Sequence, residues 1–457
     1  MPNRRLITVS LACAVVSTAA LIALATLQYG MPTRFYAIMG LGRENVPHFR
    51  EALGLPRLGP LSIPVFIFWF RALLAVSWLG YLAAVIAALK GGVPSPKVIL
   101  GIAIIAGIVL AIWWPASLSG DVYGYAAFAR MSVLHGLNPY THTPDALRAL
   151  GDASGPYARF RHTTLYGPAW TLLSTAIIAV LKWADLWWQV VALKLLAAAS
   201  LVLSAVVGRG IAEKLSPGRG NLTLLAIALN PLFLVEAPGN GHNDAFMMLL
   251  LLCGILLLLR EKRAVGFLML GLSFGVKFVT APMLCWMLME QSHGKRITER
   301  ARRTGMGALA MTVPFILCYA PFWHGMAIFS GAAHRWRWGL IWSSASKQAT
   351  ITYWLAKLMP GREDRIASFL TSPWPIFVVF LALTVWIWRR RGEVDSLTAW
   401  PVLAGCLALF TMGVPFPWYF LWGWTVSLLR WNRAHLAMSG AFLLAGFIAT
   451  MGYTVPR

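Results

Sequence analysis

Hydrophobic runs recur along the whole chain, and short polar segments separate them. Most runs approach the roughly 20 residues that an α-helix needs to cross the hydrocarbon core of a bilayer. A backbone in lipid must satisfy its own hydrogen bonds, so helices are the expected structure. The pattern therefore predicts an all-α polytopic membrane protein.

Clusters of basic residues set the predicted topology, because short loops rich in Arg and Lys stay in the cytoplasm. Three such clusters are Arg260–Arg263, Arg389–Arg391 and Arg430–Arg433. They place the N-terminus in the cytoplasm and the loops 117–186 and 324–372 outside. About 13 spans are predicted, at 6–29, 61–89, 97–116, 187–208, 221–238, 245–259, 264–289 (two), 304–323, 373–388, 397–412, 418–430 and 434–453.

Three runs need a separate interpretation. The run 163–183 follows an outer loop and precedes a crossing, so we expect a helix along the outer interface. The run 264–289 has basic residues on both flanks, which favours a hairpin of two short half-spans that turns near Lys277 to Pro282. Discontinuous helices are tolerated where they line a cavity, and a single span is the alternative. The run Leu6 to Leu27 fits a retained first helix better than a cleaved signal peptide.

Composition agrees with a membrane protein. The chain has 457 residues, of which 58% are hydrophobic and 12% charged, whereas soluble domains carry about 25% charged residues. The net charge of +23 would suggest nucleic acid in a soluble protein. Here the basic residues lie between hydrophobic runs, so orientation and anionic lipid explain them, and no nucleic-acid partner is expected.

Two groups of residues on the predicted outer loop are candidates for chemistry. Asp121 lies just after the third span, with Tyr123 and Tyr125 beside it. A carboxylate at this boundary can accept a proton from a sugar hydroxyl, and tyrosines offer stacking faces. The alternative is that Asp121 only caps a helix. Tyr140 and Tyr166 follow in turn and helix-start motifs, where anchoring at the interface explains them equally well.

A second polar cluster interrupts two apolar spans, and it contains Asn240, His242, Asn243 and Asp244. An Asp at the centre of a span costs about 2.5–3.5 kcal/mol on insertion scales, so the cluster points to a functional cavity. Helix capping by Asn243 or Asp244 is the simpler interpretation and is compatible with function. One His and one Asp do not make a metal-binding set.

Three cations complete the candidate residues. Lys277 lies inside a hydrophobic run, where an anionic partner is expected, although its side chain could also reach an interface. Arg335 and Arg337 alternate with tryptophans on the second outer loop. This pattern suits both an interfacial helix and a bidentate clamp on phosphate.

The motifs Asp-x-Tyr-x-Tyr at Asp121, Gly-x-Asn-Pro-Tyr ending at Tyr140, Tyr-Gly-Pro-x-Trp at Tyr166 and Gly-His-Asn-Asp at His242 occur in this order. Together they resemble the GT-C class of membrane glycosyltransferases, above all the polyprenol-phosphomannose-dependent α-1,6-mannosyltransferases. The motifs cover roughly residues 119–280. The resemblance implies a GT-C-like catalytic module at 1–323, then an outer loop and C-terminal helices at 324–457 without a separate soluble domain.

The resemblance also implies inverting transfer of a sugar, expected to be mannose, from a polyprenyl-phosphate donor to a glycan or glycolipid hydroxyl outside the plasma membrane. Asp121 is then the general base. His242, Lys277, Arg335 and Arg337 are candidates to hold the phosphate. The candidates for positioning substrate are Tyr123, Tyr125, Tyr140, Tyr166, Asn240, Asn243 and Asp244.

The chain departs from the family pattern in lacking an Asp-x-Asp motif on the first outer loop, which argues against a divalent metal. No cofactor is expected. Two alternatives to an enzyme stay open. A transporter or flippase of polyprenyl-linked sugars would also need a charged cavity, but transporters usually show an internal repeat and none is visible. A scaffold subunit would make Asp121 and His242 dispensable.

Overall fold

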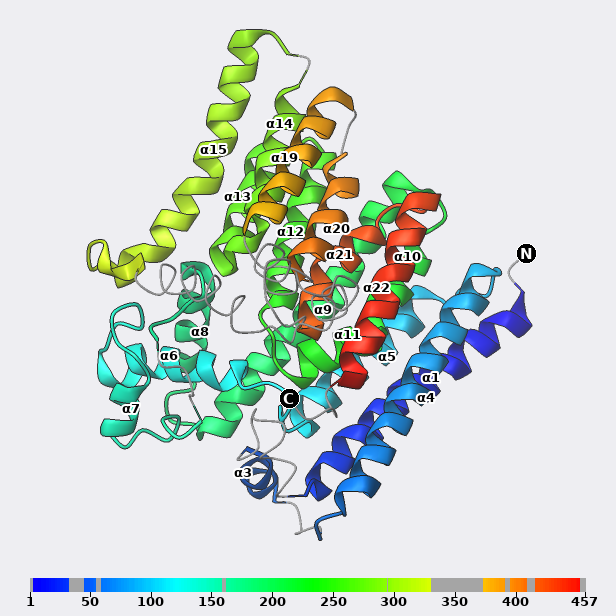
Figure 1. Ribbon diagram of the computed structural model, residues 1–457, viewed down its shortest axis with the longest axis vertical. Helices are drawn as coiled ribbons and strands as arrows, with labels where there is room; N and C mark the ends of the chain where they lie inside the picture. The colour runs from blue at the N-terminus through cyan, green and yellow to red at the C-terminus, as the bar shows by residue number, and fades with distance from the viewer. Residues whose placement is uncertain are drawn as a thin grey trace, which may run out of the picture.

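The computed structural model describes residues 3–32, 45–54, 59–157, 162–293, 295–329, 373–390, 395–408 and 416–452. These ranges form helices joined by turns, and no β-strand occurs among them (Figure 1). Arg335 and Arg337 lie outside the described residues. The all-α prediction is confirmed for the part of the chain that the structure describes.

Six helices in these ranges are long and apolar enough to cross a membrane. They are α1 (Arg4–Leu27, continued by Gln28–Gly30), α4 (Ile63–Leu89), α5 (Pro96–Trp113), α9 (Leu186–Leu215), α15 (Ile297–Tyr319, continued by Ala320–Phe322) and α22 (Arg433–Met451). A seventh candidate is a broken span that consists of α10 (Gly220–Ala228), α11 (Pro231–Leu234) and a π-helical turn (Val235–Gly239), with a bend of 47°. The chain is therefore a multi-pass membrane protein.

The predicted count of about 13 spans is not confirmed. Several predicted spans are helices well below the roughly 20 residues that a straight crossing needs. The remaining bundle helices are α12 (Asp244–Leu259), α13 (Arg263–Val276), α14 (Ala281–Ser292), α19 (Pro373–Arg390), α20 (Ser396–Cys406) and α21 (Phe420–Ser427). Charged residues follow two of them directly, Arg260 after α12 and Lys277 after α13.

The hairpin in the run 264–289 is present. α13 ends at Val276, Lys277 is extended (φ −145°, ψ 129°), and a 3₁₀ turn (Phe278–Thr280) leads into α14. Arg263 at the start of α13 and Gln291 at the end of α14 line one pocket, so the chain has reversed between them. Arginines near the starts of α13 and α15 line this pocket, and Arg300 of α15 lies over Trp388 near the end of α19. We call this region the basic end of the bundle.

Short helices form a separate layer at the lower left of Figure 1. They are α6 (Asp121–His135), α7 (Asp145–Ala149) and α8 (Pro168–Val180), and α3 (Asn45–Ala52) lies nearby at the bottom. α8 occupies the run 163–183, and its 13 residues are too few for a crossing. It packs against α6, α13 and α15.

A buried ion pair fastens this layer to the bundle. The Arg130 guanidinium donates to Asp152 Oδ1 at 2.9 Å and to Oδ2 at 3.0 Å, and also to the Gln189 side chain on α9. Burial raises the pKa of Asp152, but hydrogen bonds from Arg130, Ser154 and His135 outweigh it and hold the pKa well below its usual range. The carboxylate is therefore ionised, and it links α6 and the loop after α7.

The variant Asp152→Asn should lower the unfolding free energy by about 3 kcal/mol at pH 7, because it leaves the buried Arg130 without its counter-ion. Since the folded pKa of Asp152 is depressed, the stabilisation is full above the ordinary carboxyl pKa and disappears as pH falls through the folded value. The gap between the two proteins should thus shrink on acidification. Unfolding of both proteins in detergent at several pH values measures this difference in stability. Asp145→Asn, in an exposed pair with Arg148, is the control and should cost less than about 1 kcal/mol.

Candidate active site

Asp121 is the partly exposed member of a group of buried polar side chains. It is the first residue of α6, where the positive end of the helix favours a carboxylate. Its side chain is 23% exposed. Burial raises the pKa of Asp121, but the hydrogen bond and charge of His242, the charge of Lys277 and a hydrogen bond with Tyr166 outweigh it and lower the pKa. An ionised carboxylate with access to solvent is suited to accept a proton.

His242 lies directly behind Asp121 and is fully buried. Its Nδ1 is 3.5 Å from Asp121 Oδ2, and its Nε2 is 3.4 Å from Glu236 Oε2. The ring stacks on Trp418, with ring centres 4.0 Å apart. Both ring nitrogens face a carboxylate just beyond ordinary hydrogen-bond length. A doubly protonated ring here would donate to both carboxylates after a small shift.

Glu236 and Asn240 support this ring from the π-helical turn. Glu236 is fully buried, and Asn240 Nδ2 donates to its Oε2 at 2.9 Å. Trp114 Nε1 in turn donates to Asn240 Oδ1. Asn240 therefore orients Glu236, the carboxylate that faces His242 Nε2. Gly241 allows the tight turn to His242, because its φ is +74° and an added Cβ would lie 2.8 Å from Val122.

A second buried carboxylate, Asp244, begins α12 and holds Lys277. Lys277 Nζ lies 2.8 Å from Asp244 Oδ1 and 2.7 Å from Oδ2. Trp422 Nε1 donates to Oδ1 at 2.6 Å. Asp244 is completely buried, whereas the Lys277 side chain keeps 18% exposure. Lys277 thus has the anionic partner expected for an intramembrane cation, and it keeps one face accessible.

Tyr125 and Tyr166 connect the two parts of the site. The Tyr125 hydroxyl donates to Asn243 Oδ1 at 3.2 Å, and its ring packs edge-on against Tyr166 at 4.7 Å. Gly167 positions Tyr166, because its N–H donates to the Val276 carbonyl just before Lys277. A Cβ on Gly167 would lie 2.1 Å from the Gly275 carbonyl oxygen, so only glycine fits.

Two predicted substrate-positioning tyrosines have other contacts. The Tyr123 hydroxyl donates to the Pro115 carbonyl, and its ring packs against Trp187, fully buried. The Tyr140 hydroxyl bonds to Thr171 and to the Tyr166 carbonyl. Tyr140 therefore supports Tyr166, and Tyr123 anchors α6 on the side away from Tyr125.

Sequence reasoning missed four residues of this group, Glu236, Trp418, Tyr419 and Trp422. Lys277 Nζ lies 5.9 Å from the Tyr419 ring centre and 5.8 Å from that of Trp422. The only signal for the last three was the density of aromatic residues between Phe416 and Trp424.

In the ranges that the structure covers, no group of three or more His, Cys, Asp or Glu side chains could hold a metal ion.

Comparison with known proteins supplies a family for this arrangement. Residues 9–292 match the family described as "Alpha-(1->6)-mannopyranosyltransferase, N-terminal domain". The chain is 25% identical over 339 residues to alpha-(1->6)-mannopyranosyltransferase A of Mycobacterium tuberculosis (strain ATCC 25618 / H37Rv). This match covers 70% of the chain but only 64% of that relative's length. No solved structure matches.

The pair Lys277–Asp244 should couple strongly in a double-mutant cycle. Lys277→Met and Asp244→Asn should each cost about 3–5 kcal/mol of stability, since each leaves a buried partner unpaired. The double variant should lose less unfolding free energy than the two single variants together, by at least about 1 kcal/mol. Unfolding in detergent gives the free energy of unfolding of the wild type and the three variants. The exposed pair Arg148–Asp145 is the reference and should couple by less than about 1 kcal/mol. Simple additivity at 277 and 244 would contradict the pairing.

Proposed function

Because this chain belongs to the alpha-(1->6)-mannopyranosyltransferase family, we propose that it transfers a mannosyl unit from a polyprenyl-phosphate donor to a hydroxyl of a glycan or glycolipid. The observation that carries the proposal is the partly exposed, ionised Asp121 with two cationic or protonatable groups, His242 and Lys277, close to it. Base and phosphate-binding cation then lie in one site, as direct displacement at a sugar carbon requires.

In the proposed reaction the acceptor oxygen attacks the anomeric carbon as Asp121 removes its proton. The bond between that carbon and the phosphate oxygen breaks, and its electron pair leaves with the polyprenyl phosphate. A single displacement of this kind inverts the configuration at the anomeric carbon. One new C–O bond replaces one broken C–O bond, so no oxidant or co-reactant is needed beyond the donor and the acceptor.

Lys277 is the proposed contact for the leaving phosphate. Its ammonium has three N–H donors, and the structure gives its two hydrogen bonds to oxygens of a single carboxylate, Asp244. The side chain also keeps part of its surface accessible. A cation held this rigidly stabilises negative charge that develops on the leaving oxygen without having to reorganise. Arg335 and Arg337 are proposed to add to this charge from outside the described residues.

His242 is proposed to position Asp121 and to hold it in the ionised form, since its Nδ1 faces Asp121 Oδ2 and its Nε2 faces Glu236 Oε2. After transfer, Asp121 is proposed to release the accepted proton to water from its exposed side.

The site is proposed to face the outside of the cell membrane. The support is the placement of the basic residues at the far end of α13 from Lys277, since basic loops remain in the cytoplasm. Asp121 and the layer of short helices would then lie on the extracytoplasmic side.

The direct test is transfer by the purified protein from radiolabelled polyprenyl-phosphate mannose to a mannosyl-lipid acceptor. Asp121→Asn should lower kcat by about 10²–10⁴-fold with little change in stability, because it removes a general base but preserves shape. Asp145→Asn, an exposed carboxylate on the same loop, should keep full activity.

Activity that survives Asp121→Asn would exclude Asp121 as the base. Transfer from other polyprenyl-phosphate sugars, with none from the mannosyl donor, would exclude mannose as the substrate. Movement of the donor across liposomes without product would replace the transferase with a transporter.

Orientation has its own test in a variant without the five native cysteines, none of which forms a disulfide in the described structure. Cysteines at the exposed positions of Asp145 and Glu261 should react with a membrane-impermeant maleimide from opposite sides. In intact cells, labelling at position 145 and protection at 261 is expected. The reverse pattern would place the site on the cytoplasmic face.

A further inference from the structure

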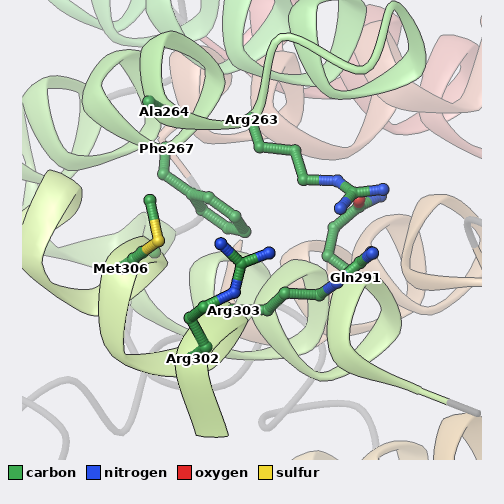
Figure 2. A pocket seen from close by; sticks show the side chains of 8 residues that line it. Arg263, Ala264, Phe267, Gln291, Arg302, Arg303 and Met306 are labelled. Atoms are coloured by element: carbon green, nitrogen blue, oxygen red, sulfur yellow. The ribbon is translucent and has the colours of Figure 1, made fainter. Parts of the chain in front are cut away.

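A basic pocket lies at the other end of α13 from the candidate active site. It is a cavity of about 120 Å³ lined by Arg263 and Phe267 on α13, Gln291 on α14, and Arg302, Arg303 and Met306 on α15. Figure 2 shows these side chains around one hollow. The 14 residues of α13 separate its two ends by about 20 Å, so this pocket is not part of the Asp121 site.

Three guanidinium groups face this pocket, and their acidic partners occupy only part of their donor capacity. Arg263 donates through one Nη to Glu261 at 2.6 Å, while its Nε is buried without a hydrogen-bond partner. Arg302 and Arg303 share the single carboxylate of Glu299. Three positive charges thus face two negative ones. A guanidinium has five N–H donors, and its free edge matches the oxygens of a phosphate.

The remaining wall is apolar and continues along an exposed helix face. Phe267 and Met306 also line the pocket, beside the arginines. From Met306, the exposed residues Leu309, Val313 and Ile316 follow at helical spacing on α15. α15 lies at the edge of the bundle in Figure 1, where such a face meets lipid. A molecule with an anionic head and an apolar chain fits this combination of surfaces.

We propose that this pocket binds the phosphate group of an anionic phospholipid, with Arg263, Arg302 and Arg303 around the headgroup and an acyl chain along Met306 and Leu309 of α15. The apolar continuation favours a lipid over free phosphate. The site is independent of the glycosyl transfer proposed above, because it lies at the opposite end of the bundle and holds no residue of that mechanism.

The test is native mass spectrometry of the full-length protein in mixed micelles with phosphatidylglycerol or phosphatidylcholine. The pocket variant is Arg263→Gln with Arg303→Gln, which leaves the Arg302–Glu299 pair intact. Its control, Arg209→Gln with Arg219→Gln, removes the same charge from two exposed positions, one in the last turns of α9 and one just before α10. Each surface arginine contributes about fivefold to general attraction by anionic lipid, so both variants lose that part equally.

The wild type should retain phosphatidylglycerol in preference to phosphatidylcholine. The pocket variant should lose at least about tenfold more bound phosphatidylglycerol than the control variant, since it also removes direct charge-assisted hydrogen bonds. Gln291→Glu, a nearly isosteric change that adds a negative charge to the pocket wall, should reduce binding in the same direction with an unchanged unfolding midpoint.

Equal losses in the pocket and control variants would overturn the proposal in favour of general charge attraction. Retention of both lipids to the same extent would overturn it as well. Displacement of the lipid by millimolar inorganic phosphate would show a site for free phosphate instead.

Discussion

The pairing of charge inside an apolar bundle is the constraint on which the rest of this structure depends. Asp244 is completely buried, and the cost of burying a carboxylate is offset only when donors surround it. Those donors come from Lys277, in the break after α13, and from Trp422 on α21. One carboxylate therefore holds together three segments that are distant in sequence. The same requirement explains why Glu236 and His242 lie side by side.

The charged residues stand where helices begin, end or break, and their signs agree with the helix dipoles. Asp121 and Asp244 are the first residues of α6 and α12, whereas Lys277 follows the last residue of α13. Anions are favoured at helix N-termini and cations at C-termini. Broken helices also free backbone groups, which are tolerated at membrane depth only where protein or a cavity satisfies them. Helix breaks and polar side chains therefore occur in the same region, because both need hydrogen-bond partners that lipid cannot provide.

The sequence predicted the nucleus of the candidate site because costly residues in apolar runs are visible without a structure. Asp121, His242, Asp244 and Lys277 do lie together. The contacts of Trp418 and Trp422 could not be predicted, since tryptophan is an ordinary residue at a membrane interface. Hydropathy predicted a span at 221–238 but could not predict its break, because it measures composition and this run stays apolar across a 47° bend. Tyr123 and Tyr125 are about 200° apart on a helix, so only Tyr125 can face the site.

The stacking of Trp418 on His242 also limits which segments could be exchanged between members of this family in a chimera. The family match ends at residue 292, yet Trp418 and Trp422 complete the surroundings of His242 and Asp244 from beyond that point. In a chimera joined at residue 292, His242 and Asp244 would come from this protein. The two tryptophan positions that surround them would come from a relative. The end of the family match at residue 292 therefore separates side chains that pack together around one pair of buried groups.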